Sequence, residues 1–153
     1  MNRSNTLLHL VAALAATATL AAAPAAQARD TEYKIPFAEV MEMPEAKQQL
    51  DGSVKFYFGD EKPGKVITTL GDDVSNKKTN GVGKDDRFGC KWAALSALVA
   101  LQDSAKRQGA NAVINVVSYY KRDTFKSNTE FECHAGAIVI GVALKGTYAK
   151  VAP

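Results

Sequence analysis

The sequence predicts an α+β domain in which one central helix packs on a small, mostly antiparallel sheet. Residues 88–108 carry a long apolar helix pattern that stops at Gly109, and two strand patterns follow at residues 111–120 and 129–144. The two cysteines, Cys90 and Cys133, fall at the start of the helix pattern and inside the last strand pattern. One disulfide would therefore join the two layers of the predicted core.

The first 28 residues have the pattern of a secretory signal peptide. Arg3 precedes an apolar run of Ala and Leu, and the small-x-small sequence AQA ends at Ala28. The run is shorter than the roughly 20 residues that cross a bilayer, so we expect cleavage after Ala28 and no stable membrane anchor. Losing Arg3 from 19 basic residues leaves 18 against 16 acidic ones. This small excess does not favour a nucleic acid as partner.

The remaining chain divides into an N-terminal extension at residues 29–52 and a single α+β domain at residues 53–153. In the extension, Pro44 predicts one or two helical turns over residues 45–50. Residues 53–58 alternate as a half-buried strand, and residues 65–70 form a second candidate strand. The short connection between them favours an antiparallel pair. Residues 71–86, rich in Asn, Asp, Lys and Gly, predict a long exposed loop.

The helix pattern at residues 88–108 is apolar over much of its circumference, which is typical of a central helix. Its last turn holds Lys106 and Arg107, which suit the negative end of the helix dipole, and Gly109 can adopt the left-handed cap. One stripe consists of small and apolar residues: Cys90, Ala94, Ala97, Leu101 and Ala105.

The two strand patterns after the helix differ in character. The strand at residues 111–120 is apolar on both faces, which predicts a middle strand covered on each side or closed on one side by a partner subunit. Its pattern places Ala112, Ile114 and Val116 on one face and Val113, Val117 and Tyr119 on the other. In the last strand Phe131 and Cys133 point away from Glu130, Glu132 and His134. The alternation is lost after Gly136, which predicts a bulge or break there.

The cysteines favour a structural disulfide between Cys90 and Cys133, because the secretory compartment oxidises thiols and a small domain gains stability from a cross-link. A reactive thiol pair is the alternative, since the start of a helix lowers a thiol pKa. A metal site formed by both cysteines and His134 is a further alternative. Adjacent strand residues point to opposite faces, however, so Cys133 and His134 do not easily reach one ion. We therefore expect no metal and no other cofactor.

Two further runs of residues bear on function. Residues 59–65 match the start of a phosphate-binding P-loop, but Val66 replaces the Ser or Thr that holds magnesium and a strand pattern follows, so we expect no nucleotide. The residues offer no nucleophile with a base nearby, which favours a protein that is not an enzyme. A local basic cluster forms a possible interaction surface, with acidic residues between its members: Lys77, Lys78, Lys84, Arg87 and Lys91.

Several segments resemble known bacterial proteins. The run GANAVINV at residues 109–116, with the apolar helix before it and the glycine-punctuated strand at residues 136–144, resembles the heavy-metal-binding-labelled domains and the signalling domain of the Rcs outer-membrane stress-sensor lipoprotein. Residues 50–59 and 129–137 are similar to short exported proteins labelled excinuclease ATPase subunit. The resemblance implies a compact α+β domain, ring-like oligomers in some members, and no catalytic residues. This sequence lacks the complete P-loops and zinc-binding cysteines of an ATPase of that kind.

We therefore expect a periplasmic, non-enzymatic α+β protein that binds a partner or senses the state of the cell envelope. The expected partner is another protein or a second copy of this chain. The alternative is a thiol-redox or metal-binding protein that uses Cys90, Cys133 and His134.

Overall fold

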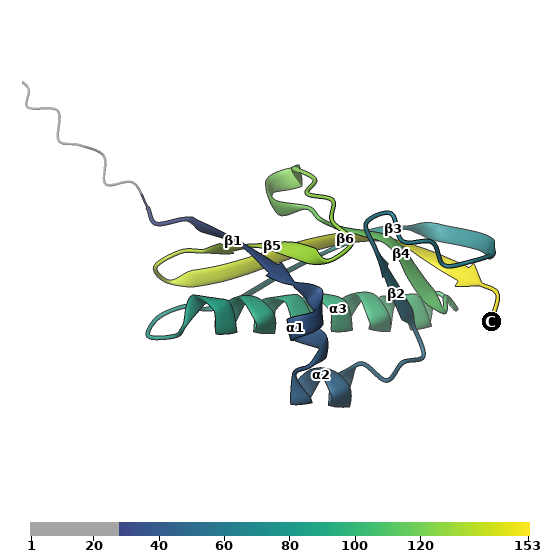
Figure 1. Ribbon diagram of the computed structural model, residues 1–153, viewed down its shortest axis with the longest axis horizontal. Coiled ribbons are helices and arrows are strands. Elements are labelled where there is room, and N and C mark those ends of the chain that lie inside the picture. The colour runs from purple at the N-terminus through teal and green to yellow at the C-terminus, as the bar shows by residue number, and fades with distance from the viewer. Residues whose placement is uncertain (1–27) are drawn as a thin grey trace, which may run out of the picture.

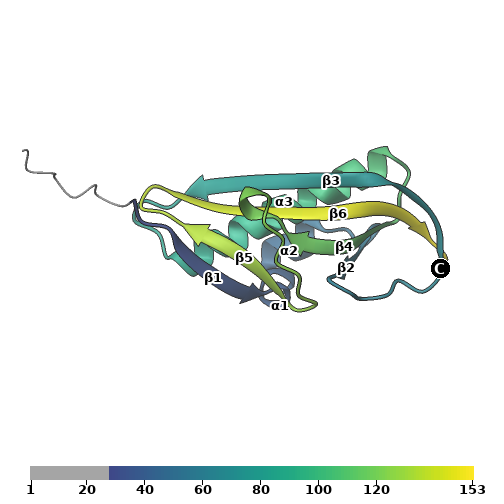
Figure 2. The same cartoon turned by 90° about the horizontal axis from the view of Figure 1, so that it is seen from above.

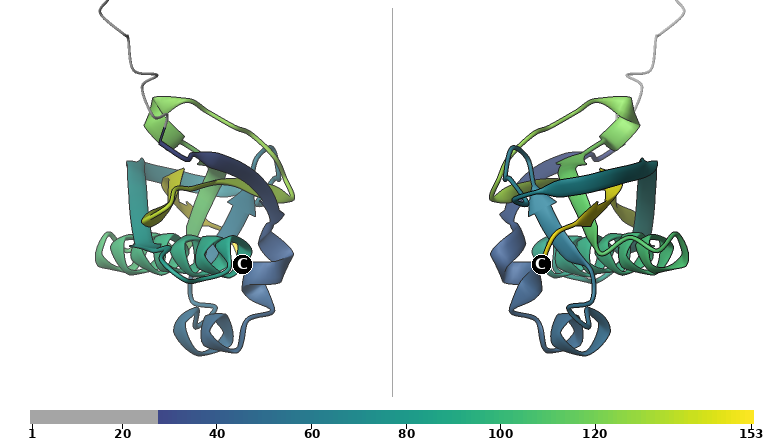
Figure 3. Two further views of the ribbon diagram at one scale, coloured as in Figure 1. Left: turned by 90° about the vertical axis from the view of Figure 1, so that its left-hand side faces the viewer. Right: turned by 90° about the vertical axis from the view of Figure 1, so that its right-hand side faces the viewer.

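The computed structural model describes residues 28–153, which form an α+β fold with one long helix against one face of a mixed sheet (Figure 1). The helix is α3 (Asp86–Arg107), and two short helices, α1 (Phe37–Met41) and α2 (Pro44–Gln49), lie beside it on the same side of the sheet (Figure 3). Residues 119–129, which include the 3-10 helix η1 (Tyr120–Arg122), arch over the opposite face. The predicted fold class is confirmed.

The sheet is organised around β6 (Val139–Val151). One side of β6 pairs with β3 (Val66–Asn80), and the other side pairs first with β5 (Glu130–Ala135) and then with β4 (Ala112–Ser118). β1 (Thr31–Pro36) extends the sheet beyond β5, and β2 (Lys55–Phe58) extends it beyond β4. All pairs are antiparallel except β2 with β4. The predicted antiparallel pairing between residues 53–58 and 65–70 is therefore wrong, because β2 and β3 lie at different edges (Figure 2).

The α3 helix ends at Arg107, within one residue of the prediction, but it begins at Asp86, two residues earlier than predicted. The Asp85 side chain caps its first turn by accepting a hydrogen bond of 2.9 Å from the Phe88 amide, and Gly109 after its end has a φ of 73°. All five residues of the predicted stripe are buried in the main core. Within that core Cys90 and Cys133 form the predicted disulfide, with their Cα atoms 5.8 Å apart.

The predicted loop at residues 71–86 is instead mostly strand. β3 continues to Asn80 and keeps an unbroken register with β6 from Asp72 onward, and only residues 81–85 form a turn before α3. The polar composition of these residues indicated a loop, but an edge strand such as β3 can have the same composition. Its outer face is exposed and its inner face is only partly covered by α3, so few of its positions require apolar side chains.

The β4 strand is a middle strand, and its own chain buries both of its faces. The residues on each face, however, do not follow a simple alternation along the strand. Asn115 has a φ of 53°, and the register with both neighbouring strands shifts at this position. This bulge turns Val116 to the same side as Val113, in the main core between α3 and the sheet. The prediction that Val116 shares a face with Ala112 and Ile114 is therefore wrong.

The last predicted strand is two strands, because the break at Gly136 is a hairpin. Gly136 donates a backbone hydrogen bond of 2.9 Å to Val139, and β6 turns back along β5. β1, which lies in the predicted N-terminal extension at residues 29–52, pairs with β5 over its full length. Its alternation of Thr31, Tyr33 and Ile35 against Glu32 and Lys34 is a strand signal that was overlooked.

The predicted signal peptide lies outside the described residues, apart from Ala28. Within residues 28–153, no helix is long and apolar enough to cross a membrane.

Candidate functional site

The five residues of the predicted basic surface do not form one surface. Lys77 and Lys78 are neighbours on β3 and therefore point to opposite faces of the sheet. Lys84 lies in the turn before α3, while Arg87 and Lys91 lie in the first turns of the helix. Lys78 and Lys84 line one pocket between β3 and α3, whereas Arg87 and Lys91 both lie near Glu39 of α1.

Apolar side chains gather at this same end of the molecule. Gly81 in the turn before α3 donates a hydrogen bond of 2.8 Å to the carbonyl of Ile138, so the turn and the β5–β6 hairpin tip lie side by side. Four large apolar residues are exposed here, and we name them the apolar end: Val82 (59% exposed), Phe88 (48%), Ile138 (67%) and Val139 (44%). Phe88 also makes an edge-on contact with Trp92, with ring centroids 6.3 Å apart.

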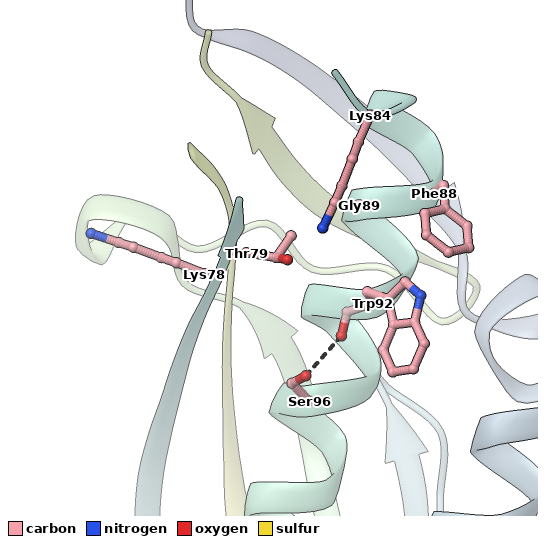
Figure 4. Close-up of a pocket in the computed structure, with 7 residues that line it drawn as sticks. All are labelled: Lys78, Thr79, Lys84, Phe88, Gly89, Trp92 and Ser96. Atoms are coloured by element: carbon pink, nitrogen blue, oxygen red, sulfur yellow. Dashed lines mark hydrogen bonds between the residues drawn. The ribbon is translucent and has the colours of Figure 1, made fainter. Parts of the chain in front are cut away.

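A small pocket of about 170 Å³ opens between β3 and α3 beside Phe88 and Trp92 (Figure 4). Lys84 reaches toward the pocket from the turn, whereas the Lys78 side chain points away from α3. The Ser96 hydroxyl donates a hydrogen bond of 2.9 Å to the Trp92 carbonyl, so it is already used within the helix. The pocket therefore combines the aromatic side chains of Phe88 and Trp92 with polar groups from β3 and the turn, among them the Lys84 ammonium.

Most other charges near the start of α3 are paired. Asp86 forms an ion pair with Arg29, and Arg87 forms one with Glu39. The hydrogen bond from Arg87 holds the pKa of Glu39 below its usual value. Among the described residues Lys84 has no ion-pair partner. It is thus a cation at this end that is available to a partner.

A second cluster lies on the outer face of the sheet, where β1 meets β5. Both ring nitrogens of His134 are 2.8 Å from a carboxylate oxygen, Nδ1 from Asp30 and Nε2 from Glu132. The Tyr120 ring stacks on the imidazole with centroids 3.5 Å apart. The hydrogen bond with His134 holds the pKa of Asp30 below its usual value. This cluster ties residues before β1 to β5.

Three side chains of this cluster have the geometry of a metal site, since ligand atoms of Glu32, Glu132 and His134 lie within 4.8 Å of one another. The Lys34 ammonium already pairs with both carboxylates, at 2.6 Å from Glu32. Burial raises the pKa of Glu132, but the hydrogen bonds from Lys34 and His134 outweigh it and the pKa is lowered. A metal ion would have to displace Lys34, so the arrangement is that of a structural ion-pair network.

The alternative site of Cys90, Cys133 and His134 is not assembled. Both cysteines are fully buried in the disulfide beneath the sheet, and His134 faces the other side of β5. The P-loop-like run at residues 59–65 connects β2 to β3, and no helix follows it to present N–H groups to a phosphate.

Sequence reasoning missed the apolar end because its members come from two separate segments. Ile138 and Val139 were assigned to a continuous strand, and Val82 to an exposed loop. Exposure of Ile138 and Val139 can be predicted only if residues 136–138 are recognised as the turn of a hairpin, and Gly136 was the available signal.

No protein-family model matches the chain, and no curated protein or solved structure is significantly similar to it. The resemblance to exported bacterial proteins therefore stays a prediction.

Proposed function

We propose that the protein is a non-enzymatic binding module of the bacterial periplasm, and that its apolar end holds an acidic, apolar segment of a partner protein. The observation that carries this proposal is the gathering of Val82, Phe88, Ile138 and Val139 at one end of the domain. Single exposed apolar residues are common on protein surfaces, whereas several large ones at the same end of a domain favour an interaction site.

The chemistry at this end indicates the kind of partner. Phe88 and Trp92 supply aromatic surface, and aromatic residues dominate the binding energy of many protein interfaces. The adjacent pocket of about 170 Å³ is smaller than the roughly 300–1,000 Å³ that is typical of small-molecule sites. It suits one side chain, and Lys84 favours a carboxylate there. A segment in which Asp or Glu alternates with large apolar residues fits both features.

The disulfide supports the exported location, because such bonds persist in oxidising compartments. It does not favour the thiol-redox alternative, since a sulfur that is fully buried does not meet a partner thiol.

The test is binding to an immobilised library of synthetic peptides in which Asp and Glu alternate with Phe and Leu. We expect Ile138→Ser and Lys84→Glu each to weaken binding by about tenfold. Two matched controls change the same residue types elsewhere: Ile67, which is 63% exposed on β3, and Lys47 on α2. Ile67→Ser and Lys47→Glu should leave binding unchanged.

Two outcomes would overturn the proposal. One is that no peptide in the library binds the wild-type protein. The other is that the controls weaken binding as much as the variants at the apolar end, because binding would then depend on general surface charge and hydrophobicity.

A further inference from the structure

The β3 strand forms a long edge of the sheet. It pairs with β6 alone among the described strands, and its 15 residues run along one margin of the sheet (Figure 2). From Asp72 to Asn80 its register with β6 is regular, so the backbone groups on its other side are arranged to pair with another strand. The α3 helix lies on one face of the sheet, where Ala100, Ser104 and Arg107 line a shallow pocket together with residues 73–77 of β3.

Charged residues usually protect such an edge, but here their order is self-complementary. The sequence DDVSNKK at residues 72–78 has two acidic residues on one side of Ser75 and two basic residues on the other. If a second copy approaches in antiparallel orientation with Ser75 opposite Ser75, Lys77 faces the partner's Asp73 and Lys78 faces the partner's Asp72. A shift of one residue keeps half of these pairs, and a shift of two keeps none. Opposite charges placed directly across a strand pair are stabilising.

Ser75 provides a second and independent observation. Its hydroxyl is the one buried side-chain polar atom without a hydrogen-bond partner in the part of the chain that the structure describes. Buried polar groups are normally paired, so an unpaired one requires an explanation. In the register that matches the charges, the two Ser75 side chains face each other across the symmetry axis. Their Cβ atoms would lie about 5 Å apart, which allows the two hydroxyls to bond.

We propose that two copies of this chain pair edge to edge through β3, antiparallel and centred on Ser75, so that the two sheets become one. The two members of each charge pair then lie on the same face of the joined sheet. Asp73 and Lys77 lie on the α3 side, opposite Gly146 and Val142 of β6, and Asp72 and Lys78 lie on the outer side.

The acidic partners are already oriented within each copy. Asp73 accepts hydrogen bonds from the Tyr148 hydroxyl at 2.6 Å and from Ser104 at 3.4 Å, and Asp72 accepts one from Thr147 at 2.6 Å. A carboxylate has further lone pairs for an ammonium group. Lys77 and Lys78 form no ion pair with any residue of the described chain. The interface therefore supplies partners for two lysines and for the Ser75 hydroxyl.

The first test is sedimentation velocity of the full chain as a function of concentration at low salt. We expect a dimer whose dissociation constant rises about tenfold in Lys78→Glu and in Asp72→Lys, because each change places like charges opposite each other. Mixing the two variants in equal amounts restores attraction in both outer pairs, so the mixture should dimerise nearly as well as the wild type. The control Lys47→Glu should leave the dimer unchanged.

Two further variants test the register. Ser75→Ala should weaken the dimer and leave the urea midpoint of the monomer equal or higher, because it removes an unpaired buried hydroxyl. Val74→Cys mixed with Asn76→Cys should form an intermolecular disulfide on mild oxidation, since these exposed positions face each other in the proposed register. A wild-type protein that stays monomeric at 1 mM would overturn the proposal. So would a dimer that is insensitive to these substitutions, or a Val74→Cys, Asn76→Cys mixture that does not cross-link.

Discussion

Removal of the disulfide by Cys90→Ala together with Cys133→Ala should lower the free energy of unfolding by about 4 kcal/mol. The two cysteines are 43 positions apart, and closing a loop of this length restricts the unfolded chain by about that amount. With a urea dependence of about 2 kcal/mol per molar, the unfolding midpoint should fall by about 2 M. Each alanine also removes a buried sulfur atom, which adds a smaller packing loss.

Equilibrium urea unfolding followed by circular dichroism measures this effect, and the single variant Cys90→Ala is its control. The single variant already lacks the disulfide, so its free energy of unfolding should be lowered by most of the 4 kcal/mol expected for the double variant, or about 3 kcal/mol. Adding Cys133→Ala should lower it only slightly further. Because both sulfurs are fully buried, reductant should open the bond of the wild-type protein only as fast as the protein unfolds. A loss under about 1 kcal/mol, or reduction much faster than unfolding, would refute the assignment of a structural disulfide.

Two other predictions concern packing and pH. Gly146→Ala should lower the free energy of unfolding by about 1–3 kcal/mol, because the new methyl group would lie 2.5 Å from the Val113 side chain. The control Gly141→Ala places its methyl group no closer than 3.6 Å to any neighbour and should leave stability unchanged. Equal losses in urea unfolding of the two variants would contradict this packing. Asp30→Asn should lower stability at pH 6 by about 0.2–1 kcal/mol, since the pair with His134 is partly exposed. The pKa of Asp30 is lowered in the folded state, so the wild-type advantage is present above the unfolded pKa of about 3.8 and is lost as the pH falls through the folded value. An advantage that does not shrink as the pH is lowered below the unfolded pKa would contradict the role of the carboxylate.

The central helix and the disulfide were predictable because their signals are local. The stripe on α3 is set by its own sequence, and its end is marked by Gly109. Burial of Cys90 and Cys133 follows from the faces that they share with other apolar residues. None of these conclusions needs knowledge of which strands pair. For the same reason the alternative site at Cys133 and His134 could be judged from strand geometry alone.

The missed elements depend on pairing between distant segments. The second half of β3 has the composition of a loop, and it is a strand because β6 offers a partner along its whole length. The parallel pairing of β2 with β4 cannot be read from the turn after β2. The bulge at Asn115 moves Val116 into the main core, and the alternation of the sequence gives no sign of it. The five predicted basic residues come from such elements, and their positions on β3, on the turn and on α3 follow from this pairing.

The two proposed surfaces, taken together, would make the protein bivalent. Asn80, where β3 reaches the apolar end, is five residues from Ser75, or about 17 Å along the strand. Antiparallel pairing would therefore place the two apolar ends about 34 Å apart along β3 and facing opposite directions.

Bivalent binding is stronger than single-site binding only where two sites can be reached at once. Ser75→Ala should therefore leave the affinity for a soluble single-site peptide unchanged, while speeding dissociation from a surface that is dense in the same peptide. Surface plasmon resonance at low and high peptide density measures both quantities. An equal effect in the two formats would show that Ser75 acts on the peptide site itself, and the link between the two surfaces would be wrong.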